Sequence, residues 1–215
     1  MNKKETYKIG ILAFGSLIDN PGEEIKEIEI ERINCKTPFK IEFARISSSR
    51  NKGPTLIPIQ DNSKGKKTNA QIIIIDHKTN MNEAKSILWR RECHITDKSK
   101  KFKDLTKPTS KNVMIEVLEN FCNVEKVLYT YFLPQDEYND LTPIKLADFA
   151  IESILSKAGK EKKDGIRYLL LAKKHGIRTQ YSDDYEKQIL LKTDTNSLEE
   201  AIEKLDKQFV TYQNK

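Results

Sequence analysis

A glycine and a serine interrupt an apolar segment near the start of the chain. Residues 8–13 predict a buried strand, which breaks at Phe14, Gly15, Ser16 and Leu17. A turn of this kind exposes several backbone N–H groups together, and such a group of donors suits a carboxylate or a phosphate. Gly15 has no Cβ, so a ligand can approach the backbone closely. The alternative is an ordinary turn that ends a strand.

A glutamate at the end of an apolar helical stripe is the second candidate for chemistry. Ala84, Leu88 and Glu92 are four residues apart, with Ile87 beside them, so they share one face of a helix predicted over 81–92. The position that should continue the apolar stripe is therefore a carboxylate, which can act as general acid and base. The alternative is a helix-end glutamate paired with a neighbouring arginine or lysine.

Three further side chains are candidates for binding a substrate. Arg45 and Arg50 could each hold a carboxylate through bidentate guanidinium contacts, with surface ion pairing as the more common alternative. Tyr131 could hydrogen-bond a substrate from a predicted strand, with core packing as the alternative.

The histidines predict neither a metal site nor a catalytic pair with a thiol. His77, His94 and His175 do not have the spacing of metal ligands. Cys93 and His94 are sequence neighbours, which on a helix point about 100° apart, so they do not predict a nucleophile and its base. We expect no metal and no cofactor.

The elements that must position these residues are strands in the first part of the chain and helices in the last third. The helix over 81–92 begins with a capping-box-like pattern at Asn80 and Glu83. The predicted strands cover residues 8–13, 25–33, 39–46, 55–59, 70–76, 113–118 and 125–133. The later predicted helices cover residues 144–158 and 166–175, and a last one follows the capping box at 197–200.

The composition predicts a globular protein with a heavily charged surface. Of the 215 residues, 37% are hydrophobic and 33% charged, enough for one substantial core or a core with a helical extension. No apolar run is long enough to cross a bilayer, and no amino-terminal segment has the layout of a signal peptide. Cys35, Cys93 and Cys122 are odd in number and widely spaced, which predicts reduced thiols. We therefore expect a cytoplasmic protein without a membrane partner.

The formal net charge of +6 raises the possibility of a nucleic-acid partner. The basic runs at 64–67 and 98–103 have no interleaved aromatic residues that could stack on bases. We interpret both runs as solvated loops and expect no nucleic acid, with a basic nucleic-acid-binding protein as the alternative.

Several segments together resemble the γ-glutamylcyclotransferase superfamily. Residues 11–22 (ILAFGSLIDNPG) resemble its glycine loop, which usually reads Tyr-Gly-Ser, with Phe14 in place of the tyrosine. Residues 88–92 (LWRRE) resemble the helix end that carries the family's catalytic glutamate. Residues 43–50 (FARISSSR) and 53–58 (GPTLIP) resemble the segment between these two signatures. The order of the segments in the chain is also that of the family.

The resemblance implies an enzyme that cyclises a γ-glutamyl group. The α-amine of the substrate attacks its own γ-carbonyl and releases 5-oxoproline and a free amine. Because nucleophile and electrophile belong to one molecule, no cofactor is implied. Glu92 would be the general acid and base, and the backbone amides of Phe14, Gly15, Ser16 and Leu17 would hold the α-carboxylate. Phe14 lacks the hydroxyl group of the family tyrosine, so a hydrogen bond from that position is not expected.

The substrate class implied is a small γ-glutamyl amide, either glutathione or another γ-glutamyl peptide or amine. Residues 124–133 and the helical tail are similar, more loosely, to the ChaC-like, glutathione-degrading branch of the superfamily. The alternative is a non-catalytic member of the same fold that binds a small anionic ligand or a partner protein. An exposed or ion-paired Glu92 would favour that alternative.

The patterns and the resemblance together predict an α+β protein. The strands and helices come from the patterns, and a mixed, partly barrel-like sheet is implied by the resemblance. We expect a γ-glutamylcyclotransferase-like core over residues 1–141 and a helical extension over 142–215 that packs on it.

Overall fold

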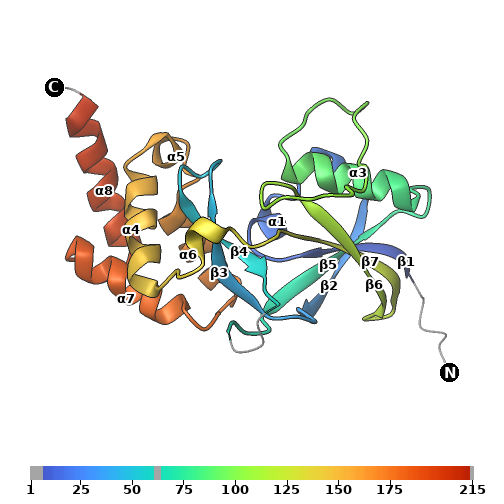
Figure 1. Ribbon diagram of the computed structural model, residues 1–215, viewed down its shortest axis with the longest axis horizontal. Helices are drawn as coiled ribbons and strands as arrows, with labels where there is room; N and C mark the ends of the chain where they lie inside the picture. Colours follow the sequence, from blue (N-terminus) through green and yellow to red (C-terminus); the bar gives the residue numbers. More distant parts are fainter. Residues whose placement is uncertain (1–6, 61–63, 214–215) are drawn as a thin grey trace. The chain divides into compact units, whose positions relative to one another are not determined.

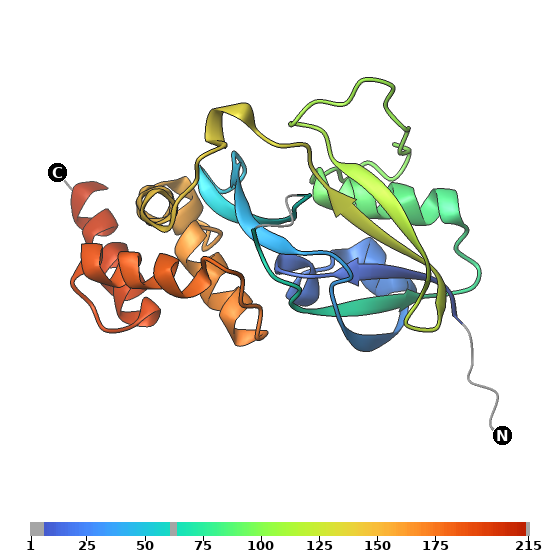
Figure 2. The same cartoon turned by 60° about the horizontal axis from the view of Figure 1, so that its bottom comes forward.

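The computed structural model describes residues 7–60 and 64–213 (Figures 1 and 2). Within these ranges it contains seven strands, eight α-helices and one short 3₁₀ helix, which confirms the predicted α+β class. None of the helices in these ranges is long and apolar enough to cross a membrane.

The chain divides into two compact units, each built from two separate segments. Unit 1 comprises Met1–Thr37 and Asn69–Leu133, and unit 2 comprises Pro38–Thr68 and Pro134–Lys215. The structure therefore groups a hairpin from the first third of the chain with the carboxyl-terminal helices, a division that the sequence patterns did not predict. The two units are described separately below.

Unit 1 contains a five-stranded mixed sheet. The central strand β1 pairs with β5 in the antiparallel sense and with β7 in the parallel sense, which confirms a mixed sheet. The strand order is β2-β5-β1-β7-β6, so β2 and β6 are edge strands and the sheet is not a closed barrel. The strands are β1 (Tyr7–Ala13), β2 (Glu29–Lys36), β5 (Asn69–Ile75), β6 (Met114–Phe121) and β7 (Val124–Tyr131).

Two elements of unit 1 closely match their sequence patterns. In β5, the four consecutive isoleucines 72–75 are all buried, as expected of a strand covered on both faces. Helix α3 (Met81–Glu92) has the predicted bounds, and the side chain of Asn80 accepts a hydrogen bond from the Glu83 amide at 3.1 Å. Helix α3 therefore begins and ends where local capping and apolar spacing require.

The predicted strand over 25–33 is wrong in its first half. Residues Glu23–Ile28 form helix α2, and β2 begins only at Glu29. The isoleucines at 25 and 28 are three residues apart, which fits one helix face as well as a strand pattern, and Ile25 is fully buried. Two glutamates in the first turn of α2, where negative charge is favoured, add to the helical preference.

Replacing Gly10 by alanine should destabilise unit 1 by about 1–3 kcal/mol. Gly10 lies on β1, and a Cβ atom there would be 2.5 Å from Cγ2 of Ile72, a side chain with no exposed surface. Urea unfolding of Gly10→Ala and wild type would measure the difference. Lys8→Ala, at an exposed position of the same strand, is the matched control, and equal stability of the two variants would contradict the close-packing explanation.

Unit 2 combines a β-hairpin with five α-helices in its described part. The hairpin joins β3 (Ile41–Ser47) and β4 (Gly53–Pro58), and the short 3₁₀ helix is Asp136–Tyr138. The helices are α4 (Pro143–Ile154), α5 (Lys157–Lys160), α6 (Gly165–Lys174), α7 (Ser182–Thr193) and α8 (Leu198–Gln213). Helix α7 had no specific prediction, whereas the caps at Thr142 and Ser197 mark helix starts as expected.

The buried carboxylate of Glu42 links the hairpin of unit 2 to the segment before α7 through hydrogen bonds. Glu42 on β3 is only 2% exposed and accepts hydrogen bonds from the amides of Phe43 (2.8 Å) and Tyr181 (3.2 Å). The Thr179 hydroxyl also donates to this carboxylate. Because a buried charge without partners is costly, these donors explain how Glu42 is accommodated.

Glu42 should make the stability of unit 2 depend on pH. Burial raises the pKa of Glu42 above its ordinary value of 4.5, an effect that outweighs the hydrogen bonds that lower it. The folded state therefore holds this proton more tightly than the unfolded state, so the contribution of Glu42 to stability declines as pH rises from 4.5 through the raised pKa.

Glu42→Gln removes this titration, so the stability advantage of wild type over the variant should shrink as the pH rises above 4.5. Urea unfolding at a series of pH values would measure it. The exposed Glu137 provides the control variant Glu137→Gln, for which no such trend is expected. A constant difference between wild type and Glu42→Gln across this range would contradict the prediction.

Candidate functional site

The turn after β1 has a backbone conformation that requires glycine. Gly15 has φ 60° and ψ −135°, a region closed to other residues, and it caps helix α1 (Ser16–Asp19). Leu17 and Ile18 are buried, so the turn is anchored in unit 1. The amides of Ser16 and Leu17, at the first two positions of α1, have no acceptor within their own helix. They are therefore available in principle to an anion.

Phe14 is half-buried at the end of β1, next to this turn. Its neighbours in the chain, Ala13 and Gly15, are both buried. The strand therefore ends before Phe14, as predicted, whereas Ser16 and Leu17 already belong to helix α1.

Glu92 is the last residue of α3, and its carboxylate is ion-paired. Its Oε1 atom accepts a hydrogen bond from Nη1 of the adjacent Arg91 at 2.6 Å, and its side chain is 17% exposed. In the described ranges, Oε1 is the only oxygen of this carboxylate that accepts a hydrogen bond. The Oε2 atom therefore remains as an acceptor for a proton or a ligand.

Arg91 connects Glu92 to the turn that contains Gly15. Its Nη2 atom lies 3.4 Å from the Ser16 hydroxyl and 2.6 Å from the carbonyl oxygen of Asn20, to which Nε also donates at 3.2 Å. The same guanidinium thus contacts α1, the residue that follows it and the Glu92 carboxylate. Glu92 and the Gly15–Ser16 turn belong to one constellation within unit 1.

Arg90, one residue before Arg91, makes a different set of contacts near the end of α3. Its side chain is 1% exposed and forms a bidentate pair with Glu24 of α2, at 2.9 and 2.7 Å. It also donates to Glu83 at 3.0 Å and to the carbonyl oxygen of Lys100 at 2.7 Å. Arg90 therefore joins α2, α3 and the loop after α3.

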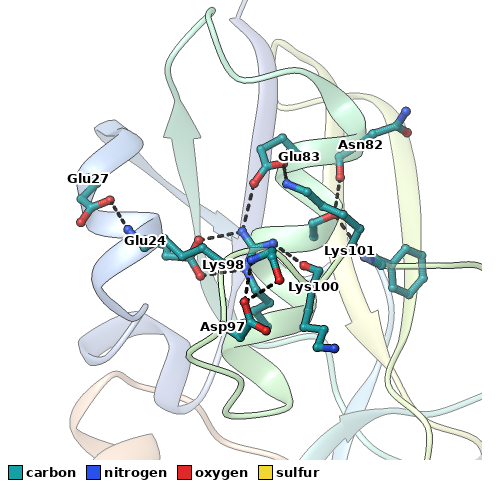
Figure 3. A network of polar contacts seen from close by, with 12 residues as sticks. Glu24, Glu27, Asn82, Glu83, Asp97, Lys98, Lys100 and Lys101 are labelled. Carbon is teal, nitrogen blue, oxygen red and sulfur yellow. Dashed lines mark hydrogen bonds and ion pairs between the residues drawn. The ribbon is translucent and has the colours of Figure 1, made fainter.

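The surroundings of Arg90 form a wider network of charges. Figure 3 shows the carboxylates of Glu24 and Glu83 pointing toward the centre of this network. Lys101 lies beside Glu83 and forms an ion pair with it. At the periphery Lys98 pairs with Glu27 at 3.1 Å. The sequence did not identify this network, because its partners come from three separate elements.

Tyr131 ends β7 beside the start of the turn. In the parallel pairing of β1 with β7, Ile11 lies opposite Leu128, and three residues further along the two strands come Phe14 and Tyr131. Tyr131 therefore lies at the same end of the sheet as the Gly15 turn. Its side chain is half-buried.

Arg45 and Arg50 lie in unit 2. Arg45 is on β3, and burial lowers its pKa. Arg50 stacks over the ring of Tyr168, 4.1 Å from its centroid, and donates to the carbonyl oxygen of Lys163 at 3.2 Å. These contacts give Arg50 a structural role within unit 2, whatever else it binds.

The described residues contain no group of three or more histidine, cysteine and acidic side chains that could hold a metal ion. Cys93 follows Glu92 and is a free, half-buried thiol, and its pKa is raised by burial and by the negative charge of Glu92. A raised pKa disfavours the thiolate, so Cys93 is poorly suited to act as a nucleophile.

Comparisons of the chain with protein-family models, with curated proteins and with solved structures give no match.

Proposed function

We propose that this protein is a γ-glutamylcyclotransferase with a γ-glutamylcyclotransferase-like fold, acting in the cytoplasm on glutathione or another γ-glutamyl peptide or amine. The observation that supports this proposal most directly is that one guanidinium, that of Arg91, contacts both the Glu92 carboxylate and the Ser16 hydroxyl. A candidate general base and a candidate anion-binding turn therefore occur together within unit 1.

In the proposed reaction, Glu92 moves a proton from one nitrogen of the substrate to another. Its Oε2 atom accepts a proton from the α-ammonium, and the resulting amine attacks the γ-carbonyl carbon. Attack leaves a positive charge on the ring nitrogen, which gives its extra proton to solvent. The tetrahedral intermediate then collapses, the bond between the γ-carbon and the leaving nitrogen breaks, and Glu92 returns its proton to that nitrogen. The products are 5-oxoproline and the free amine, and Glu92 ends as a carboxylate.

The turn has the second role in this proposal. The amides of Ser16 and Leu17 would bind the α-carboxylate and hold the γ-glutamyl group curled, with its amine near its γ-carbonyl. Holding two reacting groups in such a geometry is itself a large contribution to rate. Tyr131 is a further candidate for contact with the substrate, whereas Arg45 and Arg50 enter no step of this proposal.

The first test is the release of 5-oxoproline by the purified full-length protein. Glutathione and a panel of γ-glutamyl dipeptides and amines would be incubated with it, and both 5-oxoproline and the free amine would be quantified. Stoichiometric formation of the two products would support the proposal. The absence of product from every substrate, with folding verified by circular dichroism, would reject it.

The ion pair at Glu92 favours a second candidate function, that of a non-catalytic member of the fold which binds a small anion. Arg91 already occupies Oε1 of the carboxylate, as in a structural helix-end pair. Calorimetric titration with glutathione and with glutamate distinguishes the two candidates. Binding of either compound without release of 5-oxoproline would favour the non-catalytic function.

A further inference from the structure

One arginine joins the segment between β1 and α2 to the end of α3. The Arg91 guanidinium donates from Nε and Nη2 to the carbonyl oxygen of Asn20, at 3.2 and 2.6 Å, and from Nη1 to Oε1 of Glu92 at 2.6 Å. Its stem passes against Gly22, where an added Cβ would lie 3.1 Å from Cγ of Arg91. The side chains of Arg91 and Glu92 are only 15% and 17% exposed. The guanidinium is therefore held on two sides and largely covered from solvent.

The planar shape of the guanidinium carries this restraint to Glu92. Because Nε and Nη2 of Arg91 donate to the same carbonyl oxygen, the position of Asn20 sets the direction of Nη1. A glutamate side chain has several rotatable bonds, and holding it in one conformation costs entropy. The hydrogen bond from Nη1 restricts these rotations before a substrate binds, so Oε2 of Glu92 keeps one direction. The ammonium group of a lysine has no such plane and could not restrict Glu92 in the same way.

A second arginine, Arg32 on β2, holds the same short helix in a different way. Its Nη1 atom donates to the carbonyl oxygen of Ile18 in α1, while Nε and Nη2 pair with the two oxygens of Glu29 at 2.7 and 2.9 Å. Within the described ranges, its hydrogen bonds go to these residues and to Gln71, and none goes to Glu92. Both arginines therefore restrain α1, but only Arg91 also orients the candidate general base.

We propose that Arg91 is a positioning residue for the cyclisation, which holds the Glu92 carboxylate in the orientation that its proton transfer requires. This inference rests on the proposed function. Arg91 keeps its own proton throughout, since a guanidinium is not deprotonated in proteins. Its Nη1 atom stays on Oε1 of Glu92, while Oε2 takes the proton from the α-ammonium and later gives it to the leaving nitrogen. Arg91 thus acts on the reaction only through Glu92 and the turn.

The same guanidinium sets the position of this carboxylate relative to the turn that contains Gly15. Its Nη2 atom lies 3.4 Å from the Ser16 hydroxyl and also donates to Asn20, the residue that follows α1. Without Arg91, α1 and the end of α3 would lose a partner that they share. A misplacement of reacting groups by about 1 Å can lower a rate about a hundredfold, so the loss should appear in kcat.

The experiment compares kcat and KM for 5-oxoproline release by the full-length wild type and three variants, with folding verified by circular dichroism. Arg91→Met keeps Cβ and Cγ, which pack on Gly22, and should lower kcat about tenfold to a hundredfold. Arg91→Lys keeps the charge without the plane and should also lower kcat. The control Arg32→Met loosens only α1, so it should raise KM and keep the wild-type kcat. Wild-type kcat in the folded Arg91 variants would overturn the inference.

The double variant Arg91→Met, Glu92→Gln separates positioning from a general structural effect. Once residue 92 cannot take a proton, Arg91 has no proton transfer left to assist, so the double variant should have the kcat of Glu92→Gln alone. A structural effect of Arg91 on unit 1 would instead multiply the loss caused by Glu92→Gln. Such multiplied losses would overturn this inference and leave the proposed function in place. Absence of 5-oxoproline from the wild-type reaction would reject the proposed function, and with it this role of Arg91.

Discussion

Glu92→Gln is expected to lower kcat/KM for 5-oxoproline release at least about a hundredfold, since positioned acid–base catalysis typically contributes 10²–10⁴-fold. Glutamine has nearly the same shape and can still accept a hydrogen bond from Arg91 at Oε1. It cannot take a proton from the α-ammonium of the substrate. The loss should therefore fall on kcat, with little change in KM, because the substrate would still bind the amides of the turn.

The matched control is Glu125→Gln, which removes one negative charge from an exposed position of β7 in the same unit. Its kinetics should equal those of wild type. Equal turnover by Glu92→Gln and wild type would leave the activity in place and remove Glu92 from the mechanism. Wild-type protein that binds glutathione without turning it over would instead support the non-catalytic function, because Glu92 would then be a structural partner of Arg91.

Local patterns were sufficient to predict helix α3 and the turn at Gly15. The cap at Asn80 and the spacing of Ala84 and Leu88 act within a few residues, and both apolar side chains are fully buried as expected. The break in β1 follows in the same way from the backbone freedom of Gly15. These features depend on interactions between residues that are close in the sequence, so a single sequence is enough to predict them.

The features that the sequence did not predict depend on elements meeting in space. The sequence indicates Arg91 only as a possible ion-pair partner of Glu92. Its contact with Ser16 depends on α1 and α3 being adjacent in the fold. The grouping of β3 and β4 with the later helices also depends on the folded arrangement.

On α4, the apolar spacing places Ala147 and Ile154 on the buried side, and both are buried, whereas Ile144 is 52% exposed and Leu155 38% exposed. The spacing therefore predicts the helix and part of its buried side. Which apolar residues at the edge of that side are covered depends on the neighbouring elements.

Arg90→Met is expected to destabilise unit 1 by about 3 kcal/mol, the lower end of the range for breaking a buried ion pair. Methionine retains much of the apolar stem and removes the guanidinium, so Glu24 and Glu83 lose their shared partner. The estimate lies at the lower end because those carboxylates are 20% and 35% exposed and can recover some hydration. Urea unfolding would measure the change.

The control is Lys98→Met, which breaks an ion pair on the same network whose two side chains are each 62% exposed. Exposed pairs contribute little, so a change of about 0.5 kcal/mol or less is expected. The double variant Arg90→Met, Glu24→Gln should be more stable than the sum of the single effects predicts, since it leaves one fewer unpaired carboxylate. If Arg90→Met cost no more than Lys98→Met, Arg90 would not fix the end of α3. The position of Arg91 and Glu92 would then have to depend on other contacts of that helix.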